Sequence, residues 1–173
     1  HPAVEMDDLV RISGTVETRE GAVQVEANDV TVLDGNSADE VARRLEAATA
    51  DLAAPADVDP FVQWDALAKL RDDLEGVAKR LRQAVLEGRP IRMRHQADGD
   101  GRCASVPLQY ALERLSADRW MEPEAPQHML KRLPSKARDY ELEDVTRDLN
   151  YSLEDRKRHG QKLPLLLMLD NGC

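Results

Sequence analysis

Residues 163–169, "LPLLLML", form the longest apolar run of the chain. The run is far shorter than the ~20 residues that span a bilayer. It also lacks polar alternation, which is typical of a strand buried in a parallel sheet whose faces are covered by helices. The run therefore predicts a buried strand rather than a membrane segment.

The residues before this run predict the rest of the α/β unit. Residues 91–94 indicate a strand, and residues 118–138, with three prolines and the basic stretch "KRLPSKAR" (131–138), indicate an irregular excursion. Helices are predicted over 102–117 and 141–159, with apolar faces formed by Leu108, Leu112 and Leu115 in the first and by Leu142, Val145, Leu149 and Leu153 in the second. The order strand, helix, excursion, helix, strand is typical of a parallel α/β sheet.

The N-terminal third has a different pattern. Residues 9–17 and 22–33 alternate in polarity around a turn at 19–21, which predicts two antiparallel strands. Two strands are not stable alone. They are therefore expected to pack on the following domain or to belong to a longer β structure.

A helical region follows these strands. Asn36 or Ser37 is predicted to cap a first helix, with Glu40 completing a capping box, and "APADVDP" (54–60) ends it. Residues 61–87 predict one continuous helix, whose apolar seam consists of Leu67, Leu70, Leu74, Val77, Leu81 and Ala84. Such a seam would suit a coiled-coil dimer. Because it spans fewer than four heptads, a helical hairpin spacer packed on a neighbouring domain is the favoured interpretation.

The charge composition limits the partners. The chain carries 33 Asp and Glu against 24 Lys and Arg, a net charge of −9 that argues against a generic nucleic-acid coat but not against local basic patches. Lysine is scarce, which fits a protein soluble in concentrated salt, although a GC-rich genome would also favour arginine. No signal-peptide pattern is present, so a cytoplasmic location is expected. Cys103 and Cys173 are too few and too distant in sequence to suggest a disulfide framework.

Acidic residues follow both predicted strands of the α/β unit. The stretch "RHQADGDGRC" (94–103) places His95, Asp98 and Asp100 after the first strand, and Asp170 follows the last. Ligands of open α/β sheets bind beyond the carboxyl ends of the strands, and carboxylates with one imidazole suit manganese or magnesium. Each aspartate alone would be an ordinary turn former, but two acidic strand ends in one unit favour a metal site.

The local geometry of this stretch is also predicted. Asp98 and Asp100 lie two apart and would point to one side of an extended segment. Gly99 and Gly101 would permit a tight turn, and a helix beginning near Arg102 would direct its N-terminus at an anion. Arg94 and Arg102 flank the loop and would neutralise phosphate or serve as ion-pair partners. Cys103 has no visible base partner and is expected to be a small packing residue.

Two segments of the chain carry a family resemblance. "RPIRMRHQADGDGRCAS" (89–105) and "ARDYELEDVTRDLNYSLEDRKRHGQKLPLLLMLDNG" (137–172) resemble the archaeal RecJ-like branch of the DHH phosphoesterase superfamily, in which "HHADADG" opens the first motif and a "DNGS"-like strand end supplies the second. Residues 9–35 resemble the closing strands of an OB-fold. The resemblance implies an incomplete OB-like segment (1–35), a helical hairpin linker (36–88) and the N-terminal part of a parallel-sheet DHH-type domain (89–173).

The family resemblance also implies a function. It implies hydrolysis of phosphodiester bonds, dependent on manganese or else magnesium, from an end of single-stranded DNA or RNA. Asp98 and Asp100 match the first-motif metal carboxylates, Asp170 matches the bridging aspartate, and His95 matches the opening histidine, with Gln96 where a second histidine is usual. These three aspartates are the catalytic candidates and, with His95, the metal ligands. The candidate substrate-binding residues are Arg94, Arg102, Lys131, Arg132 and Lys136.

Alternatives to a complete nuclease remain open at this point. The third family motif, "DHH", is not in the sequence, so the isolated chain is expected to be inactive. A non-catalytic protein that binds single-stranded nucleic acid or acts as a scaffold would use the OB-like strands and the basic stretch 131–138. The OB-like segment has no aromatic residue for base stacking, which weakens that alternative. A small-molecule or oligonucleotide phosphatase would share the same metal residues.

Overall fold

The computed structural model describes residues 4–5, 8–19, 22–120 and 124–171. It divides into two compact units, residues 1–51 and 52–173. Within the described residues, no helix is both long and apolar enough to cross a membrane.

The first unit contains the predicted hairpin. Strands β1 (Val10–Arg19) and β2 (Ala22–Val32) pair antiparallel, which confirms the prediction, while residues 20–21 of the turn lie outside the described residues. The register shifts between Ser13 and Gly14. A Cβ at Gly14 would lie 2.1 Å from the carbonyl oxygen of Glu26, so the close approach of the two backbones requires glycine there.

Helix α1 (Gly35–Ala53) begins earlier than the sequence suggested. Ala38 donates its N–H to the carbonyl of Asp34, so helical hydrogen bonding starts before Asn36 and Ser37. The prediction that one of these two residues caps the helix is therefore wrong, because both lie inside the first turn. Gly35 has a φ of +47°, a conformation that glycine adopts without strain.

The prediction of one continuous helix over residues 61–87 is wrong, because this segment contains two helices, α2 (Asp65–Lys69) and α3 (Arg71–Leu86). At Leu70 the backbone adopts φ −94° and ψ 0°, and its N–H bonds to the carbonyl of Leu67 at 3.1 Å, which tightens the turn and ends α2. The apolar seam is divided accordingly. Its C-terminal members Leu81 and Ala84 are buried, whereas Leu74 and Val77 are half-exposed.

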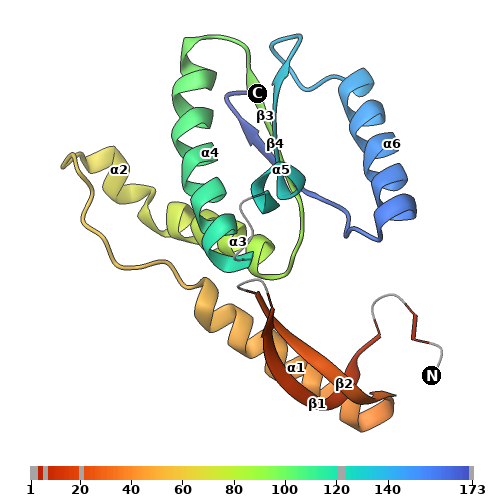
Figure 1. Ribbon diagram of the computed structural model, residues 1–173. Helices are drawn as coiled ribbons and strands as arrows, with labels where there is room; N and C mark the ends of the chain where they lie inside the picture. The colour runs from red at the N-terminus through yellow and green to blue at the C-terminus, as the bar shows by residue number, and fades with distance from the viewer. Residues whose placement is uncertain (1–3, 6–7, 20–21, 121–123, 172–173) are drawn as a thin grey trace. The chain divides into compact units, whose positions relative to one another are not determined.

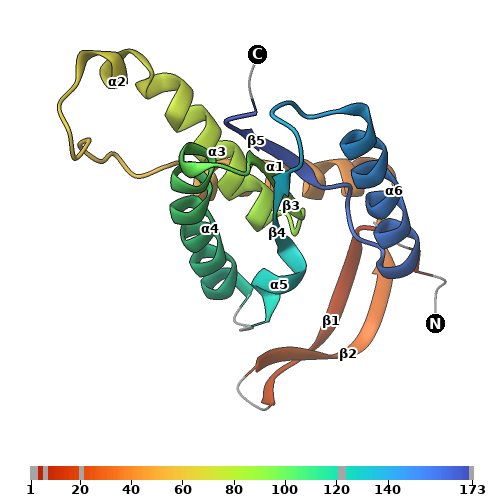
Figure 2. The same ribbon diagram turned by 90° about the horizontal axis from the view of Figure 1, so that it is seen from above.

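The second unit is built on a three-stranded parallel sheet, as predicted. Strands β3 (Ile91–Gln96), β4 (Leu130–Ser135) and β5 (Leu165–Leu169) are arranged in the order β4-β3-β5. Helices α4 (Gly99–Trp120), α5 (Ala125–Met129) and α6 (Leu142–His159) complete it. Figures 1 and 2 show α4 and α6 on opposite sides of the sheet.

Strand β4 corrects the prediction that residues 118–138 are irregular. Lysine, arginine and proline disfavour a central strand, but β4 lies at the edge of the sheet, where Pro134 is tolerated and charged side chains are common. Long-range pairing with β3 therefore outweighed the local sequence signal. Residues 131–135 of the basic stretch belong to β4, and residues 136–138 form the loop that follows the strand.

The two faces of β3 differ in chemistry because successive side chains point to opposite faces. Ile91 and Met93 join the buried core formed with Leu81, Ala84 and Val85 of α3 and Leu112 of α4. Arg92 and Arg94 point to the face covered by α6, and both are buried. The apolar core therefore lies on the α3–α4 side of the sheet.

Helix α6 packs with the side opposite to the predicted one. The apolar residues Leu142, Val145, Leu149 and Leu153 are exposed, whereas Asp144, Asp148 and Ser152 are buried. The reason is that β3 presents two arginines to this helix, and buried charges require charged or hydrogen-bonding partners. The prediction that "LPLLLML" is fully buried is likewise corrected, since Leu166 and Met168 of β5 are exposed.

Candidate functional site

The turn between β3 and α4 is organised by Asp98. Its Oδ1 accepts the N–H of Gly101 at 3.0 Å, and its carbonyl accepts the N–H of Arg102 at 3.2 Å. This is how an aspartate caps a helix. Helix α4 therefore begins at Gly99 rather than near Arg102, and Asp100 lies in its first turn. The prediction that Asp98 and Asp100 share one side of an extended segment is wrong for this reason.

The two glycines of the turn have different roles. Neither is among the glycines with positive φ, so tight turning does not require them. A Cβ on Gly101 would lie 2.2 Å from the carbonyl oxygen of Gln96, whereas a Cβ on Gly99 would meet nothing within 4 Å. Gly101 is thus needed for the close approach of α4 to the end of β3.

Three exposed carboxylates follow neighbouring strand ends. Strands β3 and β5 are adjacent and parallel, with His95 opposite Leu169. Asp98, Asp100 and Asp170 therefore all lie beyond the carboxyl ends of the strands, which we call the carboxyl edge of the sheet. Asp170 has a φ of 52°, in the left-handed region. Among the described residues, however, no three His, Cys, Asp or Glu side chains lie close enough together to hold a metal ion. The oxygen donors suit manganese or magnesium, but the structure does not gather them into a coordination shell.

Buried polar atoms without partners lie at the same edge. Within the described part of the chain, the Ser135 hydroxyl and the Asn171 side-chain amide are buried and have no hydrogen-bond partner. Ser135 ends β4 opposite Gln96 of β3, and Asn171 follows Asp170. Buried polar groups in proteins are nearly always hydrogen-bonded, so these two are suited to bind a ligand or water. Neither residue was among the predicted site residues, although Asn171 lies in the second-motif "DNG".

His95 is buried, and both of its ring nitrogens are engaged. Nδ1 lies 2.7 Å from the carbonyl oxygen of Gln96, and Nε2 lies 3.0 Å from Nη1 of Arg132. Since a guanidinium only donates, Nε2 must accept and Nδ1 must donate, which makes the imidazole neutral. Arg132 also donates from Nε to Gln109 at 2.5 Å. His95 does not fit as a metal ligand in this arrangement, because its lone pair faces a cation.

The other sequence candidates are dispersed. Arg94 is buried and bound to Asp148, so it is engaged within the protein. Arg102 is exposed on the first turn of α4. Lys131 and Lys136 are exposed. Nζ of Lys131 lies 3.9 Å from a carboxylate oxygen of Asp155, and Nζ of Lys136 lies 3.8 Å from one of Glu143. Cys103 is exposed rather than packed, and Cys173 lies outside the described residues.

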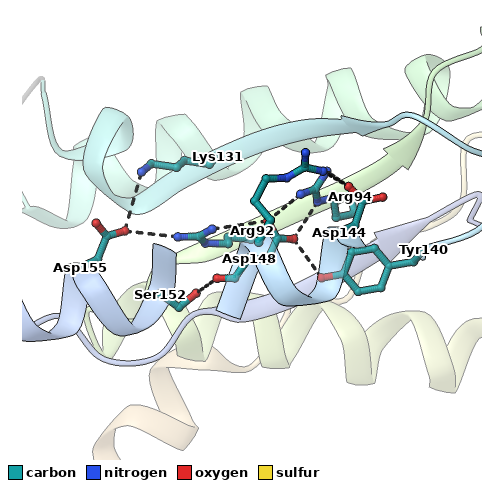
Figure 3. Close-up of polar contacts among 9 residues, drawn as sticks. Arg92, Arg94, Lys131, Tyr140, Asp144, Asp148, Ser152 and Asp155 are labelled. Carbon is teal, nitrogen blue, oxygen red and sulfur yellow. Dashed lines mark hydrogen bonds and ion pairs between the residues drawn. The ribbon is translucent and has the colours of Figure 1, made fainter. Parts of the chain in front are cut away.

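A buried charge network joins β3 to α6 (Figure 3). Arg94 donates two hydrogen bonds to Asp148, from Nε at 2.8 Å and from Nη2 at 2.6 Å, and the Tyr140 hydroxyl donates a third at 2.9 Å. Arg92 lies 3.6 Å from Asp148 and 3.3 Å from Asp155. This network was not predicted, although alternate arginines in a strand and aspartates spaced by four in a helix were its signal in the sequence.

The network shifts the pKa values of its members. Burial alone would raise the pKa of Asp148, but the hydrogen bonds from Arg94 and Tyr140 outweigh it and lower that pKa below its ordinary value. The hydrogen bond to Asp148 raises the pKa of Arg94. Burial, reinforced by the hydrogen bond to Asp148, raises the pKa of Tyr140 to about 12. Asp148 and Arg94 are therefore charged at neutral pH, and the phenol of Tyr140 is neutral.

Comparisons with known proteins agree with this fold. No protein-family model matches the chain. The chain is 43% identical to "Uncharacterized protein MJ1198" of Methanocaldococcus jannaschii over 173 residues, which is 99% of this chain and 23% of that protein. It is also similar to a solved structure described as "Member of s1p family of ribosomal proteins PF0399 DHH domain", with a TM-score of 0.73 and 41% identity over 75% of this chain and 30% of that one. The chain thus spans about a quarter of the curated relative's length. Its parallel sheet and antiparallel hairpin match part of a DHH-domain protein.

Proposed function

We propose that the chain contributes the metal-binding part of a RecJ-like exonuclease that hydrolyses phosphodiester bonds of single-stranded DNA or RNA, with manganese or magnesium held by Asp98, Asp100 and Asp170. The observation that supports this is the adjacency of β3 and β5, which brings their acidic ends to one edge of the sheet. The similarity to a DHH-domain structure at 41% identity supports the same chemistry. The finer division into an OB-like segment (1–35), a linker (36–88) and part of a DHH-type domain (89–173) belongs to this proposal.

Each residue at the edge would have a distinct task. Asp98 is fixed by its bond to Gly101, which leaves its second oxygen for a cation. Ser135 and Asn171 would bind phosphate oxygens or water through their unpartnered polar atoms. Arg102, on the exposed first turn of α4, would neutralise phosphate charge. A bound manganese ion would polarise the scissile phosphate and acidify the attacking water.

Metal binding is the direct test of this proposal. Manganese is titrated calorimetrically into the chain and into the variants Asp98→Asn and Asp170→Asn, with the exposed helical Asp118→Asn as the matched control. We expect each edge variant to bind manganese at least about tenfold more weakly, because one oxygen ligand is lost. The control should bind as the parent chain does. Identical titrations for all four proteins would overturn the metal assignment.

A non-catalytic single-strand-binding or scaffold protein is the second candidate function. It is favoured by the dispersed carboxylates, since no metal-holding group of three exists among the described residues. Oligonucleotide binding in the presence of a chelator, without heat of manganese binding, would support this candidate over the hydrolase.

A further inference from the structure

A groove of about 460 Å³ lies between β4 and α6. Lys131, Leu133 and Pro134 of β4 form one wall, and Arg147 and Tyr151 of α6 form the other. Lys136, just beyond the end of β4, also lines it. The groove therefore follows β4 toward the carboxyl edge of the sheet, where Ser135 and the three carboxylates lie.

The groove is basic in an acidic protein. Five of its ten lining residues are lysine or arginine and two are aspartate, although the whole chain has a net charge of −9. Arg92 and Arg94 are buried at the floor of the groove and are paired with Asp144, Asp148 and Asp155. The positive charge that a ligand would meet is therefore that of Lys131, Lys136 and Arg147. A concentrated positive groove of this kind attracts a polyanion against the repulsion of the remaining surface.

The cations at the rim are available to a ligand. The side chains of Lys131 and Lys136 are 51% and 75% exposed, and their ion pairs with Asp155 and Glu143 are long, at 3.9 Å and 3.8 Å. Exposed pairs of this kind contribute little stability. A phosphate group would therefore replace these carboxylates at small cost. Glu143 also pairs with Arg147 at 3.7 Å. Arg147 is bound more closely by the buried Asp144, so Glu143 is the main competitor for Lys136.

An exposed aromatic ring completes the groove. Tyr151 is 54% exposed and lies one helical turn after Arg147, on the same side of α6. Single-stranded nucleic acids bind to cationic grooves that also present aromatic rings for base stacking. A lipid surface or an acidic peptide would use the cations but would present no base to the ring.

We infer that this groove binds single-stranded polynucleotide, with the backbone along Lys131, Lys136 and Arg147 and a base stacked on Tyr151. The inference rests on the proposed function for its class of partner. It uses none of the three carboxylates, so binding in the groove does not depend on metal. The direction of β4 leads the bound strand toward the edge where hydrolysis is proposed.

Binding to a fluorescent oligothymidylate, measured by anisotropy in a chelator, tests the stacking residue. We expect Tyr151→Ala to bind about tenfold more weakly and Tyr151→Phe to bind as the parent does, because the phenylalanine ring preserves stacking. The matched control is Tyr110→Ala, which removes an exposed tyrosine of α4 outside the groove and should leave affinity unchanged. An abasic oligomer should bind the parent and Tyr151→Ala equally.

The phosphate contacts are tested by salt dependence and by a gain in affinity. The double variant Lys131→Gln/Lys136→Gln should reduce the slope of log affinity against log salt by about 1.4, as expected for two lost contacts to a single strand. The control Lys69→Gln/Lys79→Gln removes the same charge from α2 and α3 and should leave the slope unchanged. Glu143→Gln should tighten binding a few-fold because it frees Lys136 and removes a negative charge from the rim of the groove, a gain that misfolding would not produce.

Two outcomes would overturn the groove assignment. One is that groove variants and control variants bind alike. The other is that heparin, an anion without bases, binds as tightly as the oligonucleotide and shows the same dependence on Tyr151. Failure of the hydrolase proposal is a separate result. In that case Asp98→Asn leaves manganese titration unchanged while the groove variants still lose oligonucleotide.

Discussion

Asp148 is the residue on which the α6 side of the sheet depends. Its carboxylate accepts hydrogen bonds from Arg94 and Tyr140 and also faces Arg92. Removing one partner from a buried charge cluster leaves the others uncompensated, which destabilises a protein far more than losing an exposed ion pair. The contribution of Asp148 to the free energy of unfolding is therefore mainly electrostatic.

The lowered pKa of Asp148 predicts a pH dependence of folding. Asp148→Asn should lower the free energy of unfolding by about 3 kcal/mol at pH 7. Because the folded-state pKa lies below the unfolded value, the stabilisation is present above the unfolded pKa and is lost as pH falls through the folded pKa. The difference between parent and variant should therefore shrink as the pH is lowered below the ordinary aspartate range. Urea denaturation at a series of pH values measures it, and a constant difference would contradict the prediction.

The glycines of "DGDG" predict a matched pair of substitutions. Gly101→Ala should destabilise the protein by about 1–3 kcal/mol, because its Cβ would collide with the backbone of Gln96. Gly99→Ala meets no atom and should be neutral or stabilise by up to about 1 kcal/mol, since alanine favours helix. Thermal unfolding of both variants checks this. Equal losses would show that backbone freedom, not close approach, governs the turn.

At the scale of elements, α6 shows how a neighbouring strand selects the buried side of a helix. The helix offers an apolar side and an acidic side, and only the acidic side can neutralise Arg92 and Arg94 of β3. A typical helix on a sheet buries its apolar residues. Here the cost of leaving two buried guanidinium groups without partners exceeds the gain from burying leucines.

This orientation predicts the effect of substitutions along α6. Leu149→Gln should change the free energy of unfolding by less than about 0.5 kcal/mol, because Leu149 is half-exposed. Asp148→Asn, one residue away, should cost several times more. Chemical denaturation of the two variants under identical conditions compares them. A larger loss for Leu149→Gln would mean that the apolar side is the buried one.

At the scale of the whole molecule, charge is unevenly distributed. The network between β3 and α6 pairs its charges inside the protein, whereas most of the carboxylates that give the net charge of −9 are exposed. Self-repulsion among exposed carboxylates weakens the folded state at low ionic strength, and salt screens it. Buried pairs are much less sensitive to salt.

A salt-dependent stability follows from this distribution. The melting temperature should rise between low salt and molar potassium chloride, because screening relieves repulsion while the buried network persists. Circular dichroism during heating at several salt concentrations measures the effect. A flat or falling melting temperature would contradict the proposal of adaptation to concentrated salt.

The sequence by itself determined the features that depend on local pattern. Alternation of polarity predicted the β1–β2 hairpin, the strand predicted at residues 91–94 is β3, and the apolar run "LPLLLML" contains β5. The acidic strand ends could also be found, since each lies directly after its strand in sequence. Their role as metal ligands stays a prediction.

Only the tertiary structure decided the features whose partners are distant in sequence. Residues 130–135 form the strand β4 because they pair with β3. Helix α6 buries its aspartates because Arg92 and Arg94 of β3 face it and need charged partners. His95 contacts Arg132 because the pairing of β3 with β4 brings these distant residues together. A local pattern specifies which conformations a segment favours. The energy of burying a charge or completing a sheet depends on neighbours that the pattern does not contain.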